Sequence, residues 1–196
     1  MNTRQLALAL FEIQAIKFGS FTLKSGLESP IYLDLRLIIS FPSLLKEISE
    51  MMWKKAENLS FDLVCGVPYT ALPLATCLSV LHDVPMILRR KEVKEYGTKK
   101  RIEGVFEQGQ SCLILEDVIT TGSSILETCH SLSEEGLQVK DAIVIVDRQQ
   151  GARTHLQEKG IRTHSLTTLS ELVNLLYDSQ KIDRQLFQTS MSVLQQ

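Results

Sequence analysis

The chain has 196 residues, of which 44% are hydrophobic and 22% charged, a composition that is typical of one globular domain and excludes wholesale disorder. Its formal net charge is -2, so no global basic field favours a nucleic-acid partner, and any anion site must be local. No apolar run approaches the roughly 20 residues needed to cross a bilayer, which argues against a membrane-spanning protein and predicts a soluble one.

Cysteine and histidine usage points away from disulfides and metal centres. The four cysteines, Cys65, Cys77, Cys112 and Cys129, are widely spaced, lie in apolar contexts and form no C-x-x-C pair. This pattern favours buried, reduced thiols over disulfides or metal ligands, and with them a cytoplasmic location. The four histidines show no ligand spacing with cysteine or acidic residues, so the sequence predicts no structural metal site.

In chain order, an N-terminal region of forty residues precedes a regular alternation of strands and helices. That region, 1–40, contains an amphipathic helical pattern and two short extended pieces at 21–23 and 31–34. Short apolar runs rich in Val and Ile then predict strands at 61–65, 85–88, 111–115, 141–146 and 162–166. Helical patterns are found at 41–58, 71–82, 123–135, 151–159 and 169–178.

This alternation predicts an α/β fold with a doubly wound parallel sheet flanked by helices, because continuous apolar strands joined by helices form buried parallel sheets. We expect a single domain over 1–196, in which residues 1–40 form a small N-terminal hood that caps the sheet. The C-terminal tail, 179–196, is expected to form an amphipathic helix that either packs on the domain or attaches to a partner.

The segment 90–104, RKEVKEYGTKKRIEG, fits neither pattern, and such a long polar connection inside a compact domain is typical of a functional loop. Between Arg89 and Glu103 there are seven basic and three acidic residues, so a net charge of +4 lies inside a protein of net charge -2. A charge run is often only a solvated face. Next to a polyanion site, however, this segment is expected to act as a mobile lid loop.

The most informative stretch follows the apolar run 112–115. That strand is expected to end at two adjacent carboxylates, Glu116 and Asp117, which precede a hydroxyl-rich loop and a helix. The free N–H groups at a helix N-terminus bind phosphate, and Gly122 lets the backbone approach closely. The two carboxylates can accept hydrogen bonds from ribose hydroxyls or hold a divalent cation through water. The sequence therefore predicts a phosphoribosyl site, with a simple helix cap at Ser123 as the alternative.

The stretch EDVITTGSS, residues 116–124, resembles the fingerprint of the type I phosphoribosyltransferases. Together with 21–36, 64–70, 90–104 and 144–151, it resembles the orotate phosphoribosyltransferases and the transferase half of eukaryotic uridine monophosphate synthase. The resemblance implies transfer of a phosphoribosyl group from phosphoribosyl pyrophosphate to orotate, with loss of pyrophosphate, in pyrimidine biosynthesis. It further implies Mg²⁺ held mainly by substrate and water, without a direct protein ligand, and a homodimer whose lid loop acts in trans. A separate orotidylate decarboxylase is a candidate partner.

The resemblance also assigns site residues one by one. Those matched to phosphoribosyl pyrophosphate are Lys24, Tyr69, Thr70, Arg90, Lys91, Lys94, Tyr96, Glu116, Asp117, Val118, Ile119, Thr120, Thr121, Gly122, Ser123 and Ser124. Those matched to orotate are Tyr32, Leu33, Thr120 and Arg148. Those matched to catalysis are Lys94, which would offset the charge of the leaving pyrophosphate, and the ribose-binding pair Glu116 and Asp117.

Several of these segments also have a purely structural interpretation. Lys24 before Ser25-Gly26 fits the solvated turn of a hairpin, residues 66–68 form a turn pattern, and Asp147 and Arg148 could be a local ion pair. The planar guanidinium of Arg148 at the carboxyl end of a strand is suited to a carboxylate, and the resemblance implies that this carboxylate is that of orotate. Three residues depart from common family choices at substrate contacts, namely Leu33, Thr70 and Tyr96.

Two other functions stay open at this point. One is a phosphoribosyltransferase that acts on a purine or another pyrimidine, and the other is a non-catalytic phosphoribosyl-pyrophosphate sensor, since the fold also occurs in regulators. Against the first, residues 24–26, Arg148 and residues 90–97 match the orotate group. Against the second, the chain keeps both the acid pair and the basic loop, and it carries no added nucleic-acid-binding segment.

Overall fold

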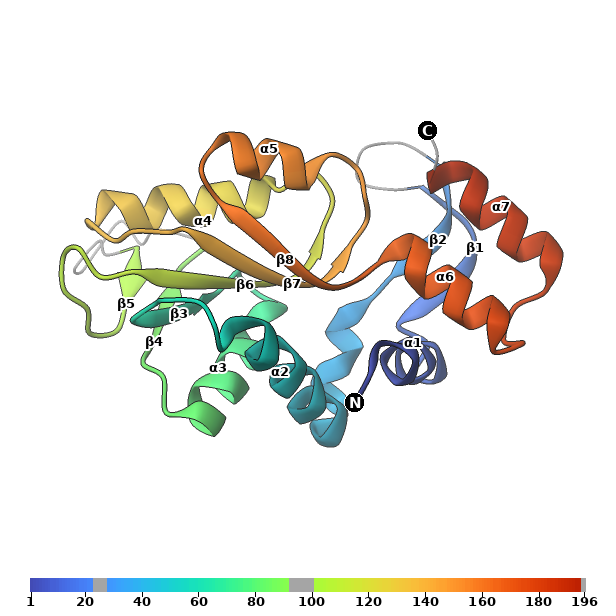
Figure 1. The fold of residues 1–196 in the computed structure, drawn as a ribbon, viewed down its shortest axis with the longest axis horizontal. Helices are drawn as coiled ribbons and strands as arrows, with labels where there is room; N and C mark the ends of the chain where they lie inside the picture. The colour runs from blue at the N-terminus through green and yellow to red at the C-terminus, as the bar shows by residue number, and fades with distance from the viewer. Residues whose placement is uncertain (23–27, 92–100, 195–196) are drawn as a thin grey trace.

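The computed structural model describes residues 1–22, 28–91 and 101–194. In these ranges a six-stranded sheet with the order β5-β4-β3-β6-β7-β8 forms the centre of the molecule (Figure 1). The strands are β3 (Leu63–Gly66), β4 (Met86–Arg89), β5 (Ile102–Glu103), β6 (Cys112–Ile119), β7 (Asp141–Asp147) and β8 (Arg162–Thr168). Every pairing in this sheet is parallel except that between β4 and β5. The predicted doubly wound α/β fold is confirmed, with one antiparallel strand added at its edge.

Helices cover both faces of the sheet because its strands are apolar on both sides. Alternate residues of β6 divide between two cores: Leu113 and Leu115 belong to one, and Cys112 and Ile114 to the other. The first core lies under α2 (Pro42–Ala56) and α3 (Ala71–His82), and the second under α4 (Ser123–Glu134) and α5 (Ala152–Glu158). Figure 1 shows the two helix pairs on opposite sides of the sheet.

The N-terminal hood consists of α1 (Thr3–Glu12), the antiparallel strands β1 (Ile16–Thr22) and β2 (Glu28–Leu33), and a 3-10 helix, η1 (Leu35–Ser40). The helix α1 begins at a capping box between Asn2 and Gln5. The strand β1 begins well before the predicted 21–23, the strand β2 begins before the predicted 31–34 and ends one residue earlier, and the 3-10 helix was not predicted. Leu6, Leu10 and Ile31 are buried in the first core, so the hood is part of the same domain.

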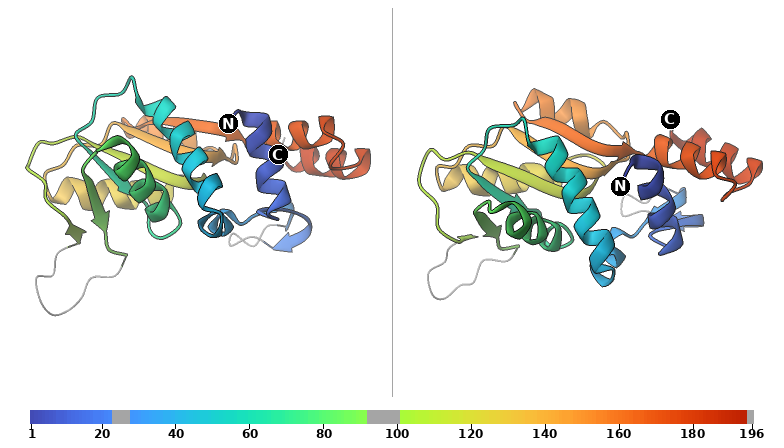
Figure 2. Two further views of the ribbon diagram at one scale, coloured as in Figure 1. Left: turned by 90° about the horizontal axis from the view of Figure 1, so that it is seen from below. Right: turned by 60° about the horizontal axis from the view of Figure 1, so that its bottom comes forward.

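The C-terminal tail packs on the domain. Helix α6 (Leu169–Asp178) follows β8 directly, and α7 (Arg184–Leu194) lies against α6 and β2 (Figure 2). The rings of Tyr177 and Phe187 are stacked, with centroids 4.5 Å apart. The predicted amphipathic terminal helix is therefore confirmed, and its apolar residues join the first core. No helix in the described part of the chain has the length and apolar character needed to span a membrane.

Two predicted boundaries were wrong. The strand β6 does not end at Leu115 but runs on through the acid pair, because Val118 and Ile119 continue the pairing with β7. The segment 90–104 is also not irregular throughout. Arg90 donates its N–H to the carbonyl oxygen of Arg101 at 2.8 Å, and β5 pairs with β4. The middle of this segment, 92–100, lies outside the described residues, so the expected lid stays a prediction.

Candidate active site

The predicted site residues at the carboxyl ends of β3, β6 and β7 lie next to one another. The chain moves outward in one direction from β3 to β4 and in the other from β6 to β7, so the strand order reverses between β3 and β6. Such a reversal leaves a crevice at the carboxyl ends of the strands. The N–H of Val67 donates to the carbonyl oxygen of Leu115 at 2.9 Å, and that of Arg148 to Ile119 at 3.0 Å. These bonds attach the turns after β3 and β7 to β6.

The loop after β6 forms a small polar hollow of about 90 Å³. It is lined by residues of the predicted phosphate loop and its surroundings: Glu116, Val118, Ile119, Thr120, Thr121, Gly122, Ser123, Ser124 and Ile125. Gly122 has φ +82°, and a Cβ at this position would lie 3.0 Å from Cγ of Leu156, so glycine is required here on two grounds. The helix α4 begins at Ser123 with exposed hydroxyls, and its first turn leaves N–H groups without intrahelical acceptors. The hollow is thus equipped to bind a phosphate.

The acid pair lies beside this hollow within β6. Glu116 is buried, with 6% of its surface exposed, whereas Asp117 is partly exposed. The N–H of Asp117 donates to Oε1 of Glu116 at 3.1 Å. Burial, and then the neighbouring carboxylate of Asp117, raise the pKa of Glu116 well above its ordinary value. Burial therefore disfavours the charged form of Glu116 in the absence of a ligand.

Replacement of Glu116 with glutamine is expected to make the protein's stability less sensitive to pH. The pKa of Glu116 is raised in the folded state. The contribution of this side chain to the free energy of unfolding is therefore fully present below the unfolded-state pKa, and it is lost as the pH rises through the folded-state pKa. Glutamine removes this titration and keeps an oxygen for the N–H of Asp117. Urea unfolding at several pH values should show an advantage of the variant that grows from about pH 4 upward. Parallel profiles for the two proteins would contradict the assignment, and Glu158→Gln on exposed α5 is the control.

Arg148 follows β7 and is buried, with 8% of its surface exposed. Its Nε has no hydrogen-bond partner among the described residues, and burial lowers the pKa of its guanidinium. The predicted alternative of an ion pair between Arg148 and Asp147 is not found: Oδ1 of Asp147 instead accepts the N–H of Gln149 at 2.7 Å. A buried guanidinium with a free donor is suited to a carboxylate ligand.

The turn after β3 carries Tyr69 and Thr70, as predicted. Gly66 ends the strand, and a Cβ there would lie 2.5 Å from the carbonyl oxygen of Ala71, so the chain can make this tight turn only with glycine. Tyr69 is 63% exposed, and Nζ of Lys91 lies 5.6 Å from the centroid of its ring. Thr70 precedes α3 and makes no capping hydrogen bond through its side chain. The beginning of the basic segment therefore lies beside this turn. An ion pair of 2.6 Å between Arg90 and Glu103 joins the two described ends of the segment to each other.

The hood residues predicted to bind orotate lie on β2. The hydroxyl of Tyr32 accepts a hydrogen bond from Arg36 at 3.2 Å, and its ring lies 5.5 Å from that of Phe21. Leu33 pairs with Ile16 and packs against the first core. Three predicted residues, Lys24, Lys94 and Tyr96, lie outside the described residues.

Two residues that sequence reasoning missed hold the site loops in place. Gln149 has φ +62°, and its Oε1 accepts hydrogen bonds from the N–H and hydroxyl of Ser170 at 3.1 and 2.6 Å. His155 lies 3.2 Å, through Nδ1, from the carbonyl oxygen of Thr121. For Gln149 the only signal in the sequence was its position directly after Arg148; for His155 there was none.

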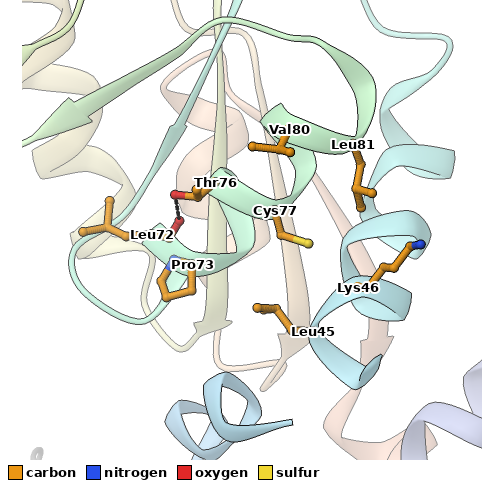
Figure 3. Close-up of a pocket in the computed structure, with 8 residues that line it drawn as sticks. All are labelled: Leu45, Lys46, Leu72, Pro73, Thr76, Cys77, Val80 and Leu81. Atoms are coloured by element: carbon orange, nitrogen blue, oxygen red, sulfur yellow. Dashed lines mark hydrogen bonds between the residues drawn. The ribbon is translucent and has the colours of Figure 1, made fainter. Parts of the chain in front are cut away.

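A larger hollow of about 560 Å³ lies elsewhere, between α2 and α3 (Figure 3). Its walls are mainly apolar, and they hold none of the predicted site residues. The lining residues are Leu45, Lys46, Leu72, Pro73, Thr76, Cys77, Val80 and Leu81. Cys77 is only partly buried there, whereas the other three cysteines are buried as predicted. Of these two hollows the smaller is the better candidate, because it combines hydroxyls, free N–H groups and a carboxylate, whereas no carboxylate lines the larger one.

Comparison with known proteins gives the class of protein that this fold and site define. The model of the phosphoribosyl transferase domain matches residues 38–163, which include the turn after β3, the acid pair, the phosphate loop and Arg148. The chain is thus a phosphoribosyltransferase by class.

Individual relatives give a narrower placement. Bovine uridine 5'-monophosphate synthase is 55% identical over 91% of this chain, which spans 38% of that protein. The orotate phosphoribosyltransferase of Chlamydia caviae is 46% identical over 85% of this chain and 82% of its own length. A structure of Leishmania donovani UMP synthase superposes with a TM-score of 0.91 at 34% identity, covering 98% of this chain and 42% of that one. The chain belongs to the orotate phosphoribosyltransferase family.

Proposed function

We propose that the chain transfers the phosphoribosyl group of phosphoribosyl pyrophosphate to orotate, forming orotidine 5'-monophosphate and pyrophosphate. The observation that carries this proposal is the juxtaposition of two complementary sites at one sheet edge. A carboxylate pair and a phosphate-binding hollow lie at the end of β6. The buried guanidinium of Arg148, whose Nε has no hydrogen-bond partner in the described part of the chain, follows the neighbouring strand β7. One part suits a sugar phosphate, and the other suits the carboxylate of an acceptor base.

The phosphoribosyl group is bound at both ends of the sugar. Its 5'-phosphate lies in the hollow after β6, where it accepts hydrogen bonds from loop N–H groups and from the hydroxyls of Thr121, Ser123 and Ser124. The ribose hydroxyls donate to Glu116 and Asp117. Because these hydroxyl donors stabilise a carboxylate, substrate binding lowers the raised pKa of Glu116 and favours its ionised form.

The reaction breaks the bond between the anomeric carbon and a pyrophosphate oxygen and forms a bond from that carbon to a ring nitrogen of orotate. The proton of that nitrogen passes to the departing pyrophosphate. Positive charge develops on the ribose and negative charge on the pyrophosphate. The acid pair lies on the ribose side and stabilises the first charge, while basic residues near Tyr69 stabilise the second. The protein has only to fix both substrates, neutralise these charges and exclude water.

Residues for the pyrophosphate come from two segments. Tyr69 and Thr70 provide the turn after β3, and Arg90 and Lys91 begin the basic segment beside it. The roles of Lys24, Lys94 and Tyr96 stay predictions from the family resemblance. We also propose that the lid loop, 90–104, acts on the neighbouring subunit of a homodimer. The apolar hollow beside Val80, which is 78% exposed, supports self-association.

The donor set fits Mg²⁺ that is bound mainly by substrate oxygens and water. Among the described residues, no group of three or more His, Cys, Asp and Glu side chains is placed to hold a metal ion. Asp117 offers one partly exposed carboxylate that can accept hydrogen bonds from the water shell of such an ion. When bound, Mg²⁺ supplies positive charge that neutralises the pyrophosphate.

A separate orotidylate decarboxylase is the proposed partner that consumes the product. Bovine uridine 5'-monophosphate synthase extends well beyond the part that matches this chain, which supports a functional link between the two activities. The tail helix α7 is occupied by its packing on α6 and β2, so its buried face does not serve as the attachment surface.

Incubation of the protein with orotate, phosphoribosyl pyrophosphate and Mg²⁺ is expected to consume orotate. The loss of orotate is measured as a decrease of its absorbance. Replacing orotate with uracil or hypoxanthine should abolish turnover, because neither base carries a carboxylate for Arg148. Binding of phosphoribosyl pyrophosphate without orotate consumption would instead identify a sensor. Turnover with hypoxanthine would identify a purine-specific transferase.

A further inference from the structure

The short helix α5 contacts the phosphate loop through two consecutive residues. Nδ1 of His155 lies 3.2 Å from the carbonyl oxygen of Thr121. A Cβ on Gly122 would lie 3.0 Å from Cγ and 3.1 Å from Cδ1 of Leu156, so the backbone at Gly122 rests directly on this side chain. Neither His155 nor Leu156 lines the hollow after β6. Their contacts are with the loop backbone.

The hydrogen bond from His155 fixes the direction of one peptide group. A carbonyl oxygen can only accept, so the proton must be on Nδ1 of His155. The carbonyl of Thr121 belongs to the same planar peptide unit as the N–H of Gly122, and in a trans peptide these two groups point in opposite directions. Holding the carbonyl toward α5 therefore directs the N–H of Gly122 away from α5. Among the described residues no acceptor is found for this N–H, which leaves it available to a ligand.

The same helix is also connected to the acceptor side of the site. It begins at Ala152, with Gly151 as its N-cap, directly after the loop that carries Arg148. The N–H of Arg148 donates to Ile119, which lies just before the phosphate loop. The loop is thus held at its beginning by Arg148 and at its turn by His155 and Leu156.

We propose that His155 is a positioning residue for the phosphate end of the substrate: by holding the carbonyl of Thr121, it directs the N–H of Gly122 toward the 5'-phosphate. This inference rests on the proposed function, which identifies the hollow after β6 as the 5'-phosphate site. His155 itself does not touch the substrate, so its loss weakens binding at the phosphate and leaves the orotate contacts intact.

The test uses the full chain and ribose 5-phosphate, which probes the phosphate loop without requiring turnover. His155→Ala is expected to weaken ribose 5-phosphate binding by about five- to tenfold in calorimetry, the range of one lost hydrogen bond. His155→Asn places an amide N–H where Nδ1 lies and should restore binding to within about twofold. His130→Ala, at an exposed histidine of α4, is the matched control with unchanged binding.

A second measurement separates positioning from a general loss of structure. Nitrogen NMR of the wild-type protein at pH 8 should show His155 with its proton on Nδ1. Unfolding temperatures should be similar for His155→Ala and His155→Asn, although only the first loses affinity. Equal ribose 5-phosphate affinity in wild type and His155→Ala, or a proton on Nε2 alone, would overturn the positioning role even if orotate is turned over.

The failure of the proposed function gives a different result. Wild-type protein that binds ribose 5-phosphate but does not consume orotate contradicts the transferase activity, while the dependence of binding on His155 still supports the positioning role. Wild-type protein that does not bind ribose 5-phosphate overturns both the phosphate site and the role of His155.

Discussion

Asp117→Asn is expected to lower kcat/KM for phosphoribosyl transfer by about a hundredfold, or about 3 kcal/mol of transition-state stabilisation. Asp117 is the partly exposed member of the pair, whereas Glu116 is buried, so the carboxylate of Asp117 is the more accessible to the ribose. Asparagine keeps the shape of the side chain but replaces one acceptor oxygen with a donor and removes the carboxylate. The loss is greatest when positive charge develops on the ribose, so kcat should fall more than KM for phosphoribosyl pyrophosphate rises.

The control for this substitution is Asp178→Asn, at an exposed residue that ends α6. Its steady-state constants should equal those of the wild type. An Asp117→Asn enzyme whose kcat is unchanged and whose KM for phosphoribosyl pyrophosphate alone rises would show that the carboxylate only binds the ground state, which contradicts its role toward the developing charge.

Arg148→Met is expected to raise KM for orotate by about a hundredfold or more, because one buried charge-assisted contact with a carboxylate contributes about 3 kcal/mol. The same variant should unfold at a higher temperature than the wild type in the absence of substrates. Burial lowers the pKa of this guanidinium and its Nε has no partner among the described residues, so the free protein bears the cost of a buried charge that methionine removes.

Arg148→Lys separates charge from shape. Lysine keeps the positive charge but not the planar, two-pronged donor arrangement, so its KM for orotate should lie between those of wild type and Arg148→Met. Arg184→Met, at an exposed position on α7, is the control. An unchanged KM for orotate in Arg148→Met, together with weaker binding of phosphoribosyl pyrophosphate, would contradict this role. It would show that Arg148 binds phosphoribosyl pyrophosphate instead of orotate.

The architecture of the sheet could be predicted from the sequence because its signal is local. Runs such as 142–146 are apolar at every position, and a strand with this pattern must be buried on both faces. The helical segments between the runs then predict crossover connections between parallel strands. As a result, alternate residues of β6 pack into two different cores, one on each face of the sheet.

The misplaced boundaries arise from pairing between distant segments. Glu116 and Asp117 are poor strand residues by composition, yet β6 continues through them because Val118 and Ile119 have partners on β7. Likewise, Ile102 forms a strand only because Arg89 lies opposite it. Neither pairing can be read from a local window.

The site was predicted unequally for similar reasons. The acid pair and the phosphate loop form one contiguous motif, so their chemistry is visible in the sequence. The burial of Arg148 and the missing ion pair with Asp147 depend on the packing around β7. The contacts of Gln149 and His155 join residues on separate elements, and such contacts leave no periodic signal.

The position of β6 between β3 and β7 has a consequence for how the protein is made. The site cannot form from either half of the chain alone. During synthesis β3 can pair with β4 at once, but β6 becomes available to pair with β3 only after the basic segment has been synthesised. Arg148 is later still, after β7. A growing chain therefore gains no stabilisation from substrate until most of the sheet has emerged from the ribosome, and shorter nascent chains depend on their apolar cores alone.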